Sequence, residues 1–197
     1  MSERLYMTLT KETFRKNSIE KIQNLHTYNK VYRDALLEQK LLRLLKKYKH
    51  RNILVYHPLP FEADIRKSIT KMRRKLNVYV PFMEGESFKM VPFRLPLKKK
   101  KFGIFEAGDT IRNIKKIDIA IVPSIGVDGD LKRIGFGKGM YDRFFAKLKK
   151  KPYTIFVQPV LCYTRESICD SYDVEADVLI TPTAEIFKGH IAIKKGN

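Results

Sequence analysis

Short apolar runs alternate with longer polar segments through most of this 197-residue chain, and this alternation constrains its fold more than any other feature. The clearest run, Ile117 to Val122 (IDIAIV), has the length and composition of a buried central strand. Strands that alternate with helices form mostly parallel sheets, because each crossover connection lies over one face of the sheet. The sequence therefore predicts an α/β fold: a three-layer domain with a mostly parallel central sheet and helices on both faces.

The other expected elements follow from apolar spacing and end signals. The segment from about 10 to 50 is predicted to be helical, with Thr10 as the N-cap of its first helix. No internal repeat and no Pro/Gly/Ser-rich linker interrupts the sequence, so we expect one domain over residues 1–197. Further strands are expected at 52–57, 77–82, 153–161 and 177–180, and further helices at 63–76 and 141–148.

Charge and composition narrow the class of protein without naming its ligand. Lys and Arg number 40 against 21 Asp and Glu, a formal net charge of +19, which favours anionic partners. The hydrophobic fraction of 44% excludes wholesale disorder. Cys162 and Cys169 are too few for a disulfide framework and are expected to be reduced thiols. Without a signal peptide or an apolar run of about 18 residues, a cytoplasmic protein with no membrane partner is predicted.

The segment from 122 to 145, VPSIGVDGDLKRIGFGKGMYDRFF, carries the pattern most typical of a binding site. A buried strand ends at Val122, and a polar loop leads to three glycines at alternate positions, 135, 137 and 139. Glycines let the backbone come close to a ligand and adopt positive φ values, and a helix is expected to begin near Gly139. Arg133 and Lys138 add cations suited to phosphate or carboxylate groups. The segment therefore predicts an anion-binding loop.

Residues 133–142, RIGFGKGMYD, resemble the signature R-[LI]-G-x-G-x-G-x-Y-D of the 5-formyltetrahydrofolate cyclo-ligase family, also called 5,10-methenyltetrahydrofolate synthetases. Two positions depart from the family pattern, Met140 in place of tyrosine and Ala107 in place of proline. Other segments resemble the family in the expected order: KETFR at 11–15, YHPLPFE at 56–62, NVYVP at 77–81, FGIFE at 102–106, and DVEAD at 173–177 followed by TP at 181–182.

The resemblance implies an ATP-dependent cyclisation of 5-formyltetrahydrofolate to 5,10-methenyltetrahydrofolate, which forms ADP and phosphate through a phosphorylated formyl intermediate. ATP is then the co-substrate and Mg²⁺ the cofactor. The implied catalytic residues are Arg133 and Lys138. The implied ATP-binding residues are Lys11, Arg15, Arg133, Gly135, Phe136, Gly137, Lys138, Gly139, Met140 and Tyr141. His57, Phe61, Glu62, Met140 and Tyr141 are implied to bind the folate, and Asp142 and Asp173 to bind the metal.

Several of these residues also have ordinary structural interpretations. Lys11 and Arg15 share a helix face and could be solvated charges, and Glu62 could be an acidic charge at a helix N-terminus. Asp142 could cap a helix, and Asp173 could be a loop carboxylate. Two other functions stay open: a basic nucleic-acid-binding module, and another nucleotide or sugar-phosphate enzyme on a similar scaffold. We expect a reduced folate, with or without a polyglutamate tail, no specific nucleic acid, and a monomer or weak oligomer.

Overall fold

The structure, a computed structural model, describes residues 9–25, 28–48, 51–99, 105–106, 108, 114 and 116–189. Its helices are α1 (Lys11–Leu25), α2 (Lys30–Leu45), α3 (Arg66–Met72) and α4 (Met140–Ala146). The main strands are β1 (Asn52–Leu54), β2 (Asn77–Glu84), β3 (Ser87–Pro92), β6 (Ile119–Pro123), β9 (Tyr153–Val157), β10 (Val178–Ile180) and β11 (Glu185–Phe187). Two short antiparallel pairs join β4 (Lys98–Lys99) to β5 (Phe105–Glu106) and β7 (Gly126–Val127) to β8 (Arg133–Ile134).

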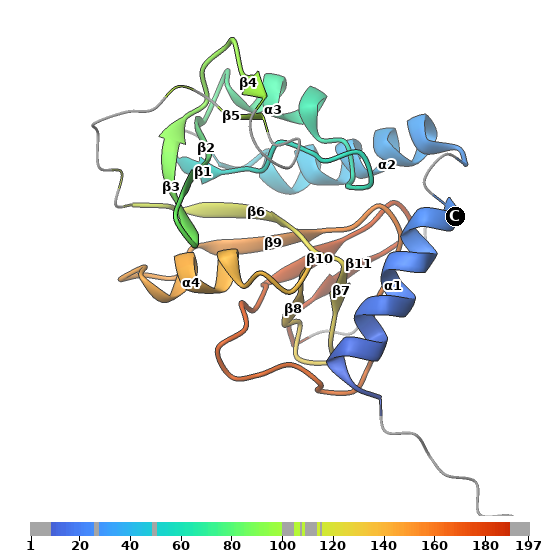
Figure 1. Cartoon of the computed structure of the whole chain (residues 1–197). Coiled ribbons are helices and arrows are strands. Elements are labelled where there is room, and N and C mark those ends of the chain that lie inside the picture. The colour runs from blue at the N-terminus through green and yellow to red at the C-terminus, as the bar shows by residue number, and fades with distance from the viewer. Residues whose placement is uncertain are drawn as a thin grey trace, which may run out of the picture.

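The main strands form a sheet of seven in the order β11-β10-β9-β6-β1-β2-β3 (Figure 1). The five strands from β10 to β2 are parallel, and the edge strands β11 and β3 are antiparallel to their neighbours. In register, Ile53 of β1 lies between Val78 of β2 and Ile119 of β6. The predicted α/β fold with a mostly parallel sheet is confirmed.

Alternate residues of the central strands pack into two separate cores, because successive side chains of a strand point to opposite faces. Ile53 and Ile121 belong to the core that also contains Leu41 of α2 and Ile69 of α3. Their neighbours on the chain, Leu54 and Val122, pack on the other face, where the core includes Phe144 of α4 and Phe156 of β9. Helices therefore cover both faces, and the central strands are apolar throughout because both of their faces are buried.

Helix α1 lies against the end of the sheet where the parallel strands terminate (Figure 1). It contacts β7, which follows directly after β6. A Cβ atom on Gly126 of β7 would lie 2.6 Å from the ring of Phe14, so any side chain at this position would push the ring away from β7. Because open α/β sheets bind ligands at the carboxyl ends of their strands, α1 is placed beside the expected site.

Some predicted boundaries differ from the structure. The helix expected at 63–76 is shorter, since α3 covers only Arg66–Met72. The strands expected at 52–57 and 153–161 end at Leu54 and Val157. The edge strands β3 and β11 were not predicted. A turn at Gly85, whose φ is 60°, folds β3 back on β2, and such hairpins depend on pairing as well as on local apolar spacing.

Two smaller expectations can also be compared with the structure. Both Cys162 and Cys169 are free thiols, as expected. Among the helices in the described ranges, none combines the length and the apolar character needed to cross a membrane.

Candidate functional site

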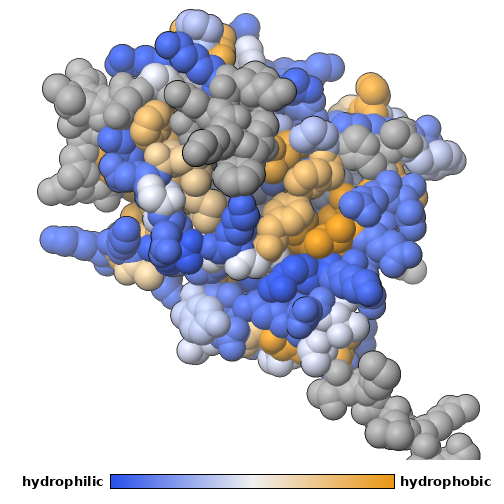
Figure 2. Space-filling model, in the orientation of Figure 1, coloured by the Kyte–Doolittle hydropathy of each residue, from blue (hydrophilic) through white to orange (hydrophobic). Residues whose placement is uncertain are grey.

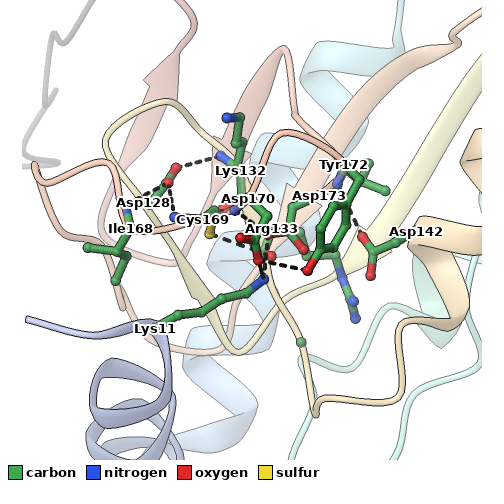
Figure 3. Close-up of polar contacts among 12 residues, drawn as sticks. Lys11, Asp128, Lys132, Arg133, Asp142, Ile168, Cys169, Asp170, Tyr172 and Asp173 are labelled. Carbon is green, nitrogen blue, oxygen red and sulfur yellow. Dashed lines mark hydrogen bonds and ion pairs between the residues drawn. The ribbon is translucent and has the colours of Figure 1, made fainter.

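The first part of the candidate site is a charged cluster, which we define as Lys11, Arg15, Asp170 and Asp173. The Thr13 N–H donates to Thr10 Oγ1 at 3.1 Å, so Thr10 caps α1 as predicted. Lys11 Nζ donates to Asp170 at 3.1 Å and to Asp173 (Figure 3). One turn later, Arg15 Nε donates to the Gly135 carbonyl at 2.8 Å. Lys11 therefore contacts the loop that carries Asp170 and Asp173, and Arg15 contacts the glycine loop, so the interpretation of both as merely solvated charges is wrong.

The ion pairs hold Lys11 in its charged form. Burial by itself lowers the pKa of Lys11, but hydrogen bonds to Asp173 and Asp170 outweigh it and raise that pKa. The side chain of Asp173 is almost completely buried, whereas that of Asp170 is half exposed. The buried partner therefore makes the more consequential ion pair, because exposed pairs contribute little stability.

Arg133 of β8 occupies the centre of the candidate site and is buried. Its Nε donates to the Pro123 carbonyl at 2.9 Å, and its guanidinium carbon lies 4.7 Å from the centre of the Tyr141 ring. Burial lowers the pKa of Arg133, while Tyr141 and nearby acids oppose that shift. A Cβ atom on Gly135 would lie 2.3 Å from Arg133 Nη1, so a side chain at this position would displace the guanidinium.

The rest of the glycine loop has the backbone conformation that the motif predicts. Gly137 and Gly139 have φ values of 90° and 56°, in the left-handed region that favours glycine. Helix α4 begins directly after Gly139, as expected. Lys138 lies exposed on this loop, and its carbonyl accepts a hydrogen bond from Arg143 Nη2 at 2.6 Å. The loop thus places backbone groups and one cation beside the charged cluster.

The second part of the site is a pocket next to the glycine loop, which we call the Glu62 pocket. The rings of Phe61 and Phe136 meet edge to face, with centres 4.9 Å apart. Figure 2 shows an apolar area near the centre of the displayed face, surrounded by hydrophilic side chains. The pocket encloses only about 10 Å³, and its larger empty volume of about 260 Å³ includes space open to solvent. Its polar side chains come from Glu62, Ser124 and Arg133, and its apolar lining includes Ile22, Phe61, Ile125, Phe136 and Val157.

Glu62 lies in the turn before α3 rather than in the helix, so its interpretation as a charge of the first helical turn is wrong. Its Oε2 accepts a hydrogen bond from the Leu59 N–H at 2.9 Å. Although the residue keeps some exposed surface, burial of the carboxyl raises its pKa to about 7, against the opposing effects of that hydrogen bond and of Arg133. The carboxyl therefore changes charge near neutral pH.

The two expected metal ligands lie on adjoining segments. Asp142 Oδ1 accepts a hydrogen bond from the N–H of Val174, the residue after Asp173, at 3.1 Å. Asp173 Oδ2 accepts a hydrogen bond from the Asp170 N–H at 2.8 Å (Figure 3). Among the described residues, Asp142 Oδ2 and Asp173 Oδ1 accept no hydrogen bond. The described residues contain no group of three or more side chains suited to a metal. Two carboxylates fit Mg²⁺ only when phosphate oxygens and water complete its coordination.

Three expected substrate residues do not line the Glu62 pocket in the described part of the chain. His57 lies close enough to Arg66 for burial and that positive charge to lower its pKa. Met140 packs against the core on the α4 face. The Tyr141 ring meets Phe88 with centres 5.1 Å apart, and burial raises its pKa. Their assignment to substrate binding stays a prediction, and Tyr141 instead supports Arg133.

Asp128 was missed by the sequence analysis, although it connects the two loops of the charged site. It is completely buried, and its Oδ1 accepts from the N–H groups of Asp130 and Lys132 at 3.1 and 2.9 Å. Its Oδ2 accepts from Ile168 and Cys169 at 3.2 and 3.0 Å (Figure 3). The sequence Asp128-Gly129 after a strand indicates a local turn. The hydrogen bonds from Asp128 to residues about 40 positions later cannot be recognised from the neighbouring sequence.

Two named relatives are similar to this chain in sequence. A 5-formyltetrahydrofolate cyclo-ligase of Mycoplasma pneumoniae is 24% identical over 176 residues, which are 87% of this chain and 98% of that protein. One of Haemophilus influenzae with the same name is 25% identical over 148 residues, 70% of this chain and 79% of that protein.

Two solved structures share the fold. A 5,10-methenyltetrahydrofolate synthetase of Aquifex aeolicus superposes with a TM-score of 0.72 at 24% identity, covering 92% of this chain and 94% of the other. The synthetase of Mycoplasma pneumoniae gives 0.69 at 23% identity, covering 88% and 99%. The sequence model of the 5-formyltetrahydrofolate cyclo-ligase family matches residues 8–182, most of the chain and all of the site described above, so this protein belongs to that family.

Proposed function

We propose that this protein converts 5-formyltetrahydrofolate to 5,10-methenyltetrahydrofolate with ATP as the co-substrate. The observation that carries the proposal is the meeting of cations from segments about 120 residues apart in the sequence. Lys11 and Arg15 of α1 face the glycine loop, and Arg133 reaches from the start of that loop into the Glu62 pocket. A site with cations on one side and an aromatic pocket on the other suits a phosphate donor and a heterocyclic acceptor.

The charged cluster and the glycine loop are proposed to bind the ATP phosphates. Arg15 and the exposed Lys138 supply positive charge, and Arg133 extends it toward the acceptor. Lys11 would bind a phosphate only by sharing or exchanging its Asp173 partner. Phosphoryl transfer depends mainly on positioning and charge stabilisation, so this set of cations meets its principal demand without a protein nucleophile.

The Glu62 pocket is proposed to hold the folate ring. The pterin ring carries adjacent N–H donors that match the two oxygens of a carboxylate. Phe61 and Phe136 give the pocket aromatic walls against which a flat ring can pack. Because Glu62 must be ionised to accept both hydrogen bonds, folate binding should strengthen as the pH rises through 7.

In the proposed reaction, the formyl oxygen attacks the γ-phosphorus, so an O–P bond forms while the bond to ADP breaks. N10 then attacks the activated formyl carbon, the bond from that carbon to the phosphate oxygen breaks, and the departing phosphate accepts the N10 proton. Arg133 is the buried cation placed to stabilise negative charge as the phosphoryl group transfers, and Lys138 is its exposed counterpart on the loop.

Mg²⁺ is proposed as the cofactor, with Asp142 and Asp173 as its protein ligands. Bound with ATP, the ion would neutralise phosphate charge. Asp142 is oriented by the Val174 N–H, and Asp173 by the Asp170 N–H and Lys11, so this chain holds both carboxylates in place. A cytoplasmic location and a monomeric or weakly oligomeric state stay predictions.

The test is an absorbance assay for methenyltetrahydrofolate with purified protein, 5-formyltetrahydrofolate and Mg²⁺, with and without ATP. We expect product only when ATP is present, with one ADP formed for each product molecule. If folded protein binds ATP but forms no product, the substrate assignment is wrong. If it binds neither ATP nor folate, the entire proposal is wrong.

A further inference from the structure

Ser124 carries a buried hydroxyl that the described structure leaves without a partner. The residue follows β6 directly and is 4% exposed. Its backbone N–H donates to the Val157 carbonyl at 3.2 Å, so its position is fixed by the sheet. Among the described residues, nothing forms a hydrogen bond with its Oγ, yet the residue lines the Glu62 pocket beside Glu62 and Arg133.

A buried hydroxyl of this kind is unusual, because most buried polar atoms in folded proteins have a hydrogen-bond partner. The neighbouring Pro123 has no N–H to offer, and its carbonyl already accepts from Arg133 Nε. A serine hydroxyl can donate one hydrogen bond and accept others. The unused capacity of Ser124 therefore lies where a ligand would lie.

Two other buried serines without hydrogen-bond partners show what is particular to Ser124. Ser68 of α3 and Ser87 of β3 also have buried hydroxyls without partners among the described residues. Neither of them lines the Glu62 pocket. Ser124 is thus distinguished by its location, and the other two supply controls that share its burial but not its access to a ligand.

We propose that Ser124 is a further substrate-binding residue, whose hydroxyl forms a hydrogen bond with the polar edge of the heterocycle held by Glu62. The proposal rests on the proposed function, because it places the reduced folate in this pocket. An uncharged hydroxyl beside a carboxyl favours a ring that offers both donors and acceptors. Ser124 would therefore help the pocket select a pterin over a purely hydrocarbon ring, which would leave the hydroxyl buried without a partner.

The test is Ser124→Ala, in which the free protein and its complex should respond in opposite directions. Removal of an unpartnered buried hydroxyl should leave the melting temperature of the free protein unchanged or raise it. Loss of one hydrogen bond should raise the KM for 5-formyltetrahydrofolate by about fivefold to tenfold. The KM for ATP should not change, and the rise in melting temperature on addition of 5-formyltetrahydrofolate should become smaller.

Ser68→Ala is the matched control, since it removes another buried hydroxyl without a partner among the described residues, and Ser68 does not line the Glu62 pocket. It should leave both KM values and the folate-induced shift as in the wild type. Ser124→Thr keeps a hydroxyl and should recover part of the lost folate affinity. It also provides an independent variant if the alanine protein fails to fold.

The outcomes separate this inference from the proposed function. An active wild type with an unchanged KM for folate in Ser124→Ala overturns the role of Ser124 alone. Equal increases in the KM for folate and for ATP, together with a lower melting temperature, would show a structural role and also overturn it. A wild type that neither binds 5-formyltetrahydrofolate nor converts it overturns both proposals.

Discussion

The charged cluster and the Glu62 pocket lie side by side but satisfy their polar groups in different ways. In the charged cluster, Lys11 is paired with Asp170 and Asp173, and Arg15 donates to Gly135. In the Glu62 pocket, Glu62 accepts one backbone hydrogen bond, and burial raises its pKa to about 7. The Ser124 hydroxyl there has no partner among the described residues. One region is internally neutralised, while the other keeps unused hydrogen-bonding capacity.

This difference indicates two modes of ligand binding in one site. An anion entering the charged cluster must compete with carboxylates for Lys11, so the local ion pairs have to rearrange. A heterocycle that enters the Glu62 pocket would form hydrogen bonds with Glu62 and Ser124 and break none there. Binding would therefore supply the hydrogen-bond partner that the Ser124 hydroxyl lacks among the described residues. Arg133 belongs to both regions, because it lines the pocket and its charge interacts with Asp142 and Asp173.

Arg133→Ala should have the largest effect, since it removes the residue that joins the two regions. Loss of a cation that stabilises transition-state charge should lower kcat by roughly 100-fold to 1000-fold. Loss of its hydrogen bond to Pro123 should also destabilise the fold by about 1–2 kcal/mol.

Steady-state kinetics and urea denaturation measure these two effects for Arg133→Ala. Lys138→Ala, on the exposed loop, is the comparison and should lower kcat without loss of stability. Wild-type kcat in Arg133→Ala would contradict its catalytic role.

Asp128→Asn tests whether the charged cluster depends on the carboxylate beneath it. Asparagine replaces one acceptor oxygen by an NH₂ group that faces two backbone N–H donors, which should destabilise the protein by about 2–3 kcal/mol. Without these hydrogen bonds, the loop at 128–132 and the loop at 168–173 should move apart. The KM for ATP should therefore increase more than the KM for folate. Urea denaturation and separate substrate titrations measure both effects. An unchanged stability would show that the buried carboxylate is dispensable.

Glu62→Gln tests the pH response of the pocket. The folded pKa of about 7 lies above the ordinary value of 4.5, so protonation of Glu62 favours the folded state. This contribution is complete below pH 4.5 and is lost as the pH rises through 7. For a partly exposed group it should amount to roughly 2 kcal/mol.

Glutamine cannot titrate, so the Glu62→Gln variant should lose this part of the pH dependence. It should therefore be more stable than the wild type at pH 8 but bind 5-formyltetrahydrofolate more weakly. Denaturation curves from pH 4 to 8 and folate titrations measure both differences. Parallel stability curves for the two proteins would rule out a raised pKa for Glu62.

Asp142→Asn should have the smallest of these effects, because phosphate oxygens supply most of the expected metal ligands. We expect the Mg²⁺ concentration for half-maximal activity to rise about tenfold, which corresponds to about 1.4 kcal/mol. The Val174 N–H can still donate to the asparagine carbonyl, so the fold should be retained. An Mg²⁺ titration identical to that of the wild type would remove Asp142 from the proposed metal site.

Much of the fold was predictable from local sequence, because its elements have local causes. The apolar run at 117–122 contains four of the five residues of β6, Ile119–Pro123. The Thr10 cap starts α1, and helix α4 follows the glycine at 139. The glycine motif also predicted its own backbone conformation. Such features depend on a few neighbouring residues, so pattern and spacing are enough.

Tertiary structure alone decided which polar groups meet and which of them have no partner. Asp128 bonds to residues about 40 positions away, Lys11 pairs with Asp173 across 162 positions, and the β3 and β11 edges depend on pairing. The raised pKa of Glu62 and the unpartnered hydroxyl of Ser124 come from the shape of the pocket around them. Burial and long-range contact are properties of the packed chain, so no local pattern of residues contains them.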